Sequence, residues 1–188
     1  MSIHLPDLNE LKRLVSLYNS EYAYGQLYQF LFPLLKRFCF YLLKSRELAE
    51  EAASDVMITL WRKREELIAV ENLRVYAFVI AKNVSLNILR KNGRQETISI
   101  DDLQLETKLD DLNPEQMLIN DELKRQLEVA THQLPNRCQL VFKLIKEDGM
   151  SYKEVAGILH ISVKTVDAHL VAAMKKLSSR LQVEYKLS

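Results

Sequence analysis

The chain has 188 residues, and its 26 Lys and Arg against 25 Asp and Glu leave a formal net charge of +1, which excludes a uniformly basic protein. A hydrophobic content of 48% excludes a wholly disordered chain, and four Gly and four Pro are too few for a linker-rich or glycine-loop protein. No stretch approaches the roughly 18 apolar residues of a membrane span, and the first residues lack the order of a signal peptide. The two cysteines can form neither a disulfide framework nor a four-ligand zinc site. We therefore expect a cytoplasmic protein without membrane insertion, cofactor or metal.

The first half of the chain has helical spacing of its apolar residues. Residues 22–44 are rich in Tyr, Phe and Leu, and Pro33 is expected to kink or divide that segment. Residues 47–62 form a second predicted helix, with a buried stripe of Ala49, Ala53, Val56 and Leu60. On a different face of the same helix, an exposed acidic stripe is predicted from Glu47, Glu51 and Asp55.

A third helix is predicted over residues 72–91, where Asn92-Gly93 marks its end. Its apolar positions include Val75, Val79, Ala81 and Ile88. The polar residues of this helix include Lys82, Asn83, Asn87, Arg90 and Lys91. Residues 94–112 lack a sustained period and are interpreted as a linker, after which Asn113-Pro114 has the residues of a helix start.

Charge is distributed in three blocks along the chain. Residues 1–95 carry a net charge of +4, residues 96–122 carry −8, and residues 123–188 carry +5. Two basic helical blocks joined by an acidic strip suggest two anion-binding modules with a tether, although solvated helix faces would produce the same pattern.

The last third of the chain predicts a helix-turn-helix. A helix runs to about Glu147 and Asp148-Gly149 forms a turn. Ser151 and Glu154 then have the spacing of a capping box for a short helix that ends near Leu159. Ser162 can cap a final helix, whose core stripe is Val166, Leu170, Ala173 and Leu177.

In such a motif the start of the last helix enters the major groove of DNA. The residues there that the core stripe does not use are Lys164, Thr165, Asp167, Ala168 and His169. Lys164 can bind a phosphate or a guanine edge, and the free N–H groups near Ser162 can bind a phosphate. A plain helical hairpin in a bundle is the alternative to a DNA-reading motif.

Particular segments carry a resemblance to a known family. Leu134–Arg137, Gly149–Ala156 and Ile161–Val166 resemble region 4 of bacterial sigma factors, although LuxR-type regulators end with similar residues. The N-terminal half separates these two families, because Leu48–Trp61, Tyr76–Asn83 and Leu89–Lys91 resemble sigma region 2. Both regions in this order, joined by an acidic linker, are the layout of an extracytoplasmic-function (ECF, group 4) sigma-70 factor.

The resemblance implies an all-α protein of two small helical domains that has no catalysis of its own. Residues 1–93 would bind core RNA polymerase and would recognise and melt the −10 promoter element. Residues 94–112 would be an acidic linker near the active-site cleft of the polymerase, and residues 113–188 would recognise the −35 element. The implied partners are core RNA polymerase, through its β′ clamp helices and β flap, promoter DNA and an anti-sigma factor.

The resemblance also assigns roles to residues. Those that would bind the polymerase are Glu51, Ser54, Asp55, Met57 and Ile58. Those that would bind the −10 element are Tyr76, Lys82, Asn83, Asn87, Arg90 and Lys91, with the loop 65–72 setting base choice. Those that would bind the −35 element are Arg137, Lys153, Ser162, Val163, Lys164, Thr165, Asp167, Ala168 and His169. His160 replaces a glycine often found in this turn, and it is costlier than glycine if the turn needs a positive φ.

Three other functions compete with this interpretation. A LuxR-type regulator would bind duplex DNA without polymerase, but it needs a sensing domain of alternating strands and helices, and residues 1–95 lack that alternation. An enzyme that uses Glu47, Glu51 and Asp55 would need a partner for them, and no His lies at ligand spacing. A pure protein-interaction bundle leaves the composition of residues 162–169 unexplained.

Overall fold

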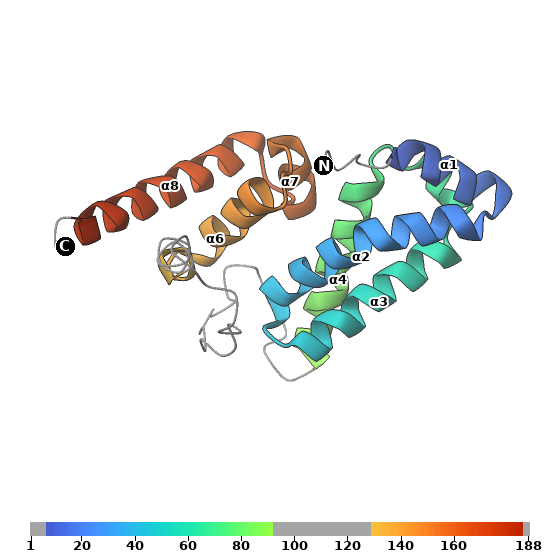
Figure 1. Ribbon diagram of the computed structural model, residues 1–188, viewed down its shortest axis with the longest axis horizontal. Coiled ribbons are helices and arrows are strands. Elements are labelled where there is room, and N and C mark those ends of the chain that lie inside the picture. The colour runs from blue at the N-terminus through green and yellow to red at the C-terminus, as the bar shows by residue number, and fades with distance from the viewer. Residues whose placement is uncertain (1–6, 92–128, 186–188) are drawn as a thin grey trace. The chain divides into compact units, whose positions relative to one another are not determined.

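The structure is a computed structural model that describes residues 7–91 and 129–185, with side chains described as far as residue 179. Within these ranges the regular structure is helical and no strand occurs, which confirms the all-α prediction there. The chain divides into two compact units (Figure 1). Helices α1 to α4 lie in the first unit, and the second contains α6, α8 and the first residues of α7. The predicted linker 94–112 and the predicted helix start at Asn113 lie outside the described residues.

The first helix, α1 (Leu8–Tyr18), is not among the elements that the residue pattern predicts. Asp7 caps its start by accepting hydrogen bonds from the backbone N–H groups of Asn9 and Glu10, at 3.0 and 3.2 Å. Asn19 ends the helix in the left-handed conformation, with a φ of 52°. The buried face of α1 packs against α2, η1 and α4.

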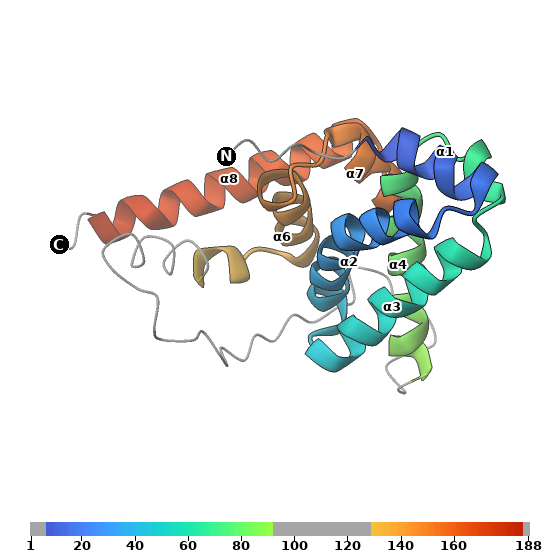
Figure 2. The same cartoon turned by 45° about the vertical axis from the view of Figure 1, so that its right-hand side comes forward.

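Helices α2 (Glu21–Leu43), α3 (Arg46–Arg62) and α4 (Leu73–Lys91) pack on one another in the first unit (Figure 2). Pro33 lies inside α2, so the predicted division of this segment does not occur. Proline removes the hydrogen bond to the carbonyl four residues earlier, which is that of Gln29. Both residues are exposed, so water can bind the carbonyl and the helix continues.

The predicted buried stripe of α3 is confirmed, because its three residues before Leu60 are fully buried and Leu60 is 2% exposed. Of the apolar positions named for α4, Ala81 is buried, whereas Val75, Val79 and Ile88 are half-buried. The apolar residues of α4 that are buried are Leu73, Ala77, Phe78, Ala81 and Leu89. Phe78 meets Phe38 of α2 with ring centroids 5.0 Å apart, so packing on the aromatic residues of α2 selects the core face of α4.

In the second unit, residues 129–132 are helical and are followed by α6 (Asn136–Phe142). The predicted helix to Glu147 does continue, but its last turn, Lys143–Glu147, is a π-helix (η3). Gly149 then turns the chain with a φ of 64°. Helices α7 (Tyr152–Leu159) and α8 (Val163–Tyr185) follow, and α6 packs against α8. All four predicted core positions of α8 are at most 5% exposed, which confirms that stripe.

Over the described part of the chain, no single helix has both the length and the apolar composition to cross a membrane; α7 and α8 meet that test only as a pair bent by 105°.

Candidate nucleic-acid and partner surfaces

The turn between α7 and α8 is built from local hydrogen bonds. The predicted capping box of α7 is present: Ser151 N–H donates to Glu154 Oε2 at 2.9 Å, and Glu154 N–H donates to Ser151 Oγ at 3.3 Å. Ser162 caps α8, since its Oγ accepts from the N–H of Thr165 at 3.0 Å. The bend of 105° between the two helices lies in the range of helix-turn-helix motifs.

His160 closes α7 in the left-handed conformation, with a φ of 55°. The N–H of Ile161 donates to the carbonyl of Ala156 at 3.1 Å, which is the long hydrogen bond of a Schellman motif. The position therefore does need a positive φ, and a histidine occupies it at some energetic cost.

The exposed face at the start of α8 contains part of the predicted DNA-binding set. Lys164, Asp167 and Ala168 are exposed, and Val163 is 45% exposed. The hydroxyls of Ser162 and Thr165 lie 2.8 Å apart, so each is engaged within the cap. The side chains directed away from the core are thus one cation, one carboxylate and two small apolar groups.

His169 does not share this outward face. Its Nδ1 lies 3.7 Å from Sγ of Cys138 on α6, and the ring is half-buried. Burial raises the pKa of the Cys138 thiol, and the nearby charge of Lys176 offsets only part of that effect. The contact with Cys138 thus places the ring of His169 against α6. Elsewhere in this unit, Lys153 is exposed on α7 and Arg137 is half-buried on α6.

Most of the predicted −10 residues share one face of α4. Asn83, Asn87, Arg90 and Lys91 are exposed and lie at helical spacing, and half-buried Tyr76 lies two turns earlier. Arg90 Nη1 donates to Asn87 Oδ1 at 3.0 Å, so the amide fixes the guanidinium along the helix. Lys82 departs from the prediction, because it is 6% exposed and does not share the face.

The α3–α4 loop, residues 63–72, leads into α4. Several of its side chains are exposed, and hydrogen bonds fix its backbone. It contains a short 3₁₀ turn, η1 (Glu66–Ala69), and Leu67 of this turn is 1% exposed in the core. Ile68 beside it is 46% exposed, and Ala69 and Glu71 are also exposed. Asn72 ends the loop by capping α4, because its Oδ1 accepts from the N–H of Val75 at 3.0 Å.

Two hydrogen bonds tie this loop to α1. Lys12 Nζ donates to the carbonyl of Val70, and Arg64 Nε donates to Oδ1 of Asn19, each at 2.5 Å. Residue spacing offers no signal for either bond, because the partners are 58 and 45 positions apart in the sequence.

Trp61, at the end of α3, is part of the packing. Its ring lies 4.8 Å from that of Tyr24 on α2, and the guanidinium of Arg64 lies 4.8 Å above it. The Tyr24 hydroxyl donates to the carbonyl of Met57 at 2.7 Å, and burial raises the pKa of Tyr24 to about 12.

Helix α3 has the predicted acidic face. Glu47, Glu51 and Asp55 are exposed, and Ile58 is 46% exposed beside them. Ser54 is half-buried, with Oγ donating to the carbonyl of Glu50 at 2.8 Å. Met57 does not share the exposed face, because its side chain is 1% exposed, and its role in binding stays a prediction.

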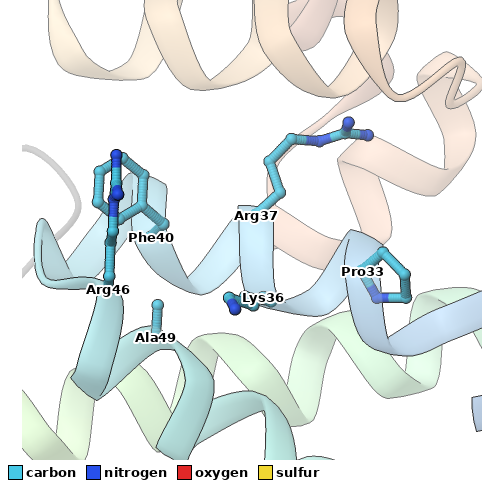
Figure 3. Close-up of a pocket in the computed structure, with 6 residues that line it drawn as sticks. All are labelled: Pro33, Lys36, Arg37, Phe40, Arg46 and Ala49. Atoms are coloured by element: carbon cyan, nitrogen blue, oxygen red, sulfur yellow. The ribbon is translucent and has the colours of Figure 1, made fainter. Parts of the chain in front are cut away.

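A hollow of about 500 Å³ lies between α2 and α3, and no residue pattern in the sequence points to it. It is lined by Pro33, Lys36, Arg37, Phe40, Arg46 and Ala49 (Figure 3). The three cationic side chains do not point to a common centre in Figure 3, and Lys36 forms an ion pair with Glu50. The hollow is therefore better suited to contact with a protein surface than to a small anion. Among the described residues, no cluster of His, Cys, Asp or Glu could hold a metal ion.

Two family models match the chain, one to each unit. The model for sigma-70 region 2 matches residues 27–95, and a model for sigma-70 region 4 matches residues 124–177. The ECF RNA polymerase sigma-E factor of Haemophilus influenzae is 26% identical over 145 residues, which cover 73% of this chain and 77% of that protein. The sigma-E factor of Escherichia coli K12 is 24% identical over 139 residues, 70% of this chain and 73% of that protein.

Solved structures have the same fold. CnrH in complex with the cytosolic domain of CnrY matches with a TM-score of 0.63 and 18% identity, over 93% of this chain and 97% of that one. The sigma factor RpoE of Bartonella quintana, in complex with the anti-sigma factor NepR, matches with a TM-score of 0.61 and 23% identity, over 85% of this chain and 97% of that one.

Proposed function

Because the chain belongs to the sigma-70 family of RNA polymerase sigma factors, in its ECF group, we propose that it binds core RNA polymerase in the cytoplasm and directs transcription from promoters with −10 and −35 elements. The observation that carries the proposal is the presence of region 2 and region 4 in one chain, in that order. A LuxR-type regulator accounts for the second unit alone. In this role the protein supplies promoter specificity, and the polymerase supplies the catalysis.

The second unit reads the −35 element in this proposal. The start of α8 enters the major groove, where Lys164 reaches a guanine edge or a phosphate and Ala168 meets a thymine methyl. Asp167 can accept from the amino group of cytosine. Val163 and Thr165 line the same entry, and the N-terminus of α8 at Ser162 attracts a phosphate. Arg137 and Lys153 contact the DNA backbone, and His169, whose ring also packs on Cys138, completes the predicted −35 set.

The first unit recognises the melted −10 element. Holding unpaired bases requires polar groups that can reach base edges and cations that can reach the backbone. The exposed face of α4 has both, with two asparagines followed by Arg90 and Lys91, and Tyr76 offers a ring near the loop. Lys82 lies off this exposed face and stays a predicted member of the set. The exposed side chains of the α3–α4 loop then set base choice.

The acidic face of α3 binds the β′ clamp helices of the polymerase. The contacts are assigned to Glu51 and Asp55 of that face and to Ser54 and Ile58 beside them. Exposed carboxylates around one exposed isoleucine have the composition of an interface, with an apolar centre and a polar rim. The second unit contacts the β flap. An anti-sigma factor is a further partner, since the CnrH and RpoE relatives were solved with CnrY and NepR. The domain bounds 1–93 and 113–188 remain predictions.

Run-off transcription from a promoter library tests the proposal, with purified core polymerase in the presence and absence of the protein. Protein-dependent transcripts that share two sequence blocks are expected. Tight, sequence-specific binding of the isolated protein to duplex DNA, together with no binding to core polymerase, would overturn the proposal in favour of the LuxR-type regulator.

The polymerase-binding face has a separate test. Asp55→Lys reverses a charge on the exposed face of α3 and is expected to reduce holoenzyme formation in co-purification with core polymerase. Glu21→Lys makes the same charge change on α2, outside that face, and is the matched control. Undiminished assembly of the Asp55→Lys protein would remove the assignment of this face.

A further inference from the structure

The α3–α4 loop has little packing of its own to fix its shape. Only Leu67 anchors it in the core, whereas Ile68, Ala69 and Glu71 are exposed. Its internal backbone hydrogen bonds all lie within consecutive short turns: Glu66 N–H donates to the Lys63 carbonyl at 2.9 Å, Leu67 N–H to that of Arg64 at 3.2 Å, and Val70 N–H to that of Leu67 at 2.9 Å. A turn of this length is weakly stable by itself.

Two hydrogen bonds, one with Lys12 of α1 and one with Asn19 at its end, add the long-range support that the turn lacks. Near the start of the loop, Asn19 Oδ1 accepts a hydrogen bond from Arg64 Nε. Near its end, Lys12 Nζ donates a hydrogen bond to the Val70 carbonyl. Lys12 is 8% exposed, so its ammonium has little access to water and depends on the Val70 carbonyl as its partner. An ammonium bound to a carbonyl is among the stronger hydrogen bonds in proteins.

The bond at Val70 acts on the exposed part of the loop. Val70 is the residue at which the chain leaves the 3₁₀ turn for an extended conformation, with φ of −76° and ψ of 119°. Holding its carbonyl fixes the peptide plane between Val70 and Glu71. The backbone that leads into the exposed residue Glu71 is therefore held by Lys12 of α1.

We propose that Lys12 and Asn19 of α1 are positioning residues, which hold the α3–α4 loop in the shape that selects an unpaired −10 base. The inference rests on the proposed function of the loop and adds α1 to the specificity machinery. Neither residue touches DNA in this scheme. A loop held in its binding shape loses less entropy on binding, and the correct base therefore gains more than an incorrect one.

The experiment uses holoenzyme assembled from core polymerase and the full chain. Its ligands are single-stranded oligonucleotides with the −10 sequence of a promoter selected by run-off transcription, and with single-base changes of that sequence. The variants are Lys12→Met, which keeps the length of the side chain but removes the donor, and Asn19→Gly, which tolerates the left-handed φ but removes the acceptor. Arg13→Met is the matched control, because Arg13 pairs with Glu10 on the exposed face of α1, and among the described residues it has no bond to the loop.

The quantity measured is the ratio of affinities for the preferred and the substituted base. We expect Lys12→Met to lower this ratio about five- to ten-fold, Asn19→Gly to lower it less, and Arg13→Met to leave it unchanged. A variant that is merely less stable lowers the active fraction for all oligonucleotides alike and leaves the ratio intact. A ratio unchanged in Lys12→Met, or lowered equally in Arg13→Met, would overturn the inference while the proposed function stands. No base preference in the wild-type holoenzyme would overturn the role of the loop as well.

Discussion

The α3–α4 loop and the turn between α7 and α8 both precede a helix that we assign to promoter DNA, but their conformations have different origins. In the turn, the capping bonds join residues three apart in the sequence, Ser151 with Glu154 and Ser162 with Thr165. In the loop, the bonds from α1 span 58 and 45 residues. The shape of the turn is therefore a local property, whereas the shape of the loop depends on the fold of the whole first unit.

This difference has a functional side. The major groove of duplex DNA is a regular surface, and a capped helix fits it without further adjustment. An unpaired base has no regular surroundings, so the protein must supply a shaped site for it. A loop held from a distant helix can supply that site and still expose its side chains.

The largest effect is expected at the core anchor of the loop. Leu67→Ala should lower the free energy of unfolding by about 2–5 kcal/mol, because the leucine is fully packed and its removal leaves a cavity. Urea unfolding of the full chain measures the loss. Ile68→Ala, one residue along and half-exposed, is the control and should change stability by less than about 0.5 kcal/mol. Equal losses in the two variants would show that the loop is not anchored as the structure has it.

The next effect concerns the outward face of α8. Lys164→Ala should weaken use of the −35 element by about 1–3 kcal/mol if Lys164 contacts a base, with the loss concentrated at one promoter position. A uniform loss across −35 sequences would make Lys164 a phosphate contact. Lys176→Ala removes the same charge about 18 Å further along the helix and should leave −35 selectivity intact. Unchanged −35 use by Lys164→Ala would contradict the assigned face.

A smaller effect is expected at the capping box of α7. Ser151→Ala should lower the free energy of unfolding by about 1 kcal/mol, since the N–H of Glu154 loses its acceptor. Ser179→Ala removes an exposed hydroxyl that donates only to the carbonyl of Lys176 within α8, and it should be nearly neutral. Chemical unfolding of both variants, measured side by side, compares them. A neutral Ser151→Ala would mean that the turn does not depend on its local cap.

The smallest effects are a pair with opposite signs. His160→Gly should stabilise the protein by about 0.5–1 kcal/mol, because glycine adopts the φ of 55° without strain. Gly149→Ala should destabilise it by about 1 kcal/mol: an added Cβ meets no atom within 4 Å, so only the φ of 64° opposes it. Melting temperatures of the two variants should therefore move in opposite directions. A shift of both in one direction would contradict this account of the turns.

Prediction from the residues succeeded where neighbours along the chain supply the physics. The bounds of α3, α4 and α7 follow from caps and hydrophobic spacing to within a residue or two, and the core stripes of α3 and α8 follow from periodicity. The cost at His160 is local as well, because it comes from the positive φ of the residue that ends α7. The exposed acidic face of α3 and the outward residues of α8 were predictable for the same reason.

The features that residue spacing did not indicate share a dependence on contacts between helices. On the core face of α4, Phe78 packs on Phe38 of α2, and Met57 of α3 is buried in the first unit. His169 lies at the right spacing for DNA, and its ring also contacts Cys138 of another helix, which the spacing did not indicate.

Short-range patterns in the chain were enough to identify two helical units, their helix ends and most of the polar surface that we assign to DNA and polymerase. They could not indicate that Lys12 and Asn19 hold the α3–α4 loop, since a hydrogen bond between residues 58 or 45 positions apart leaves no periodic trace in the sequence. A cap forms wherever its few residues occur together, because its partners are already neighbours. A long-range bond forms only after packing has brought its two partners together, so it belongs to the folded unit and not to any segment of it.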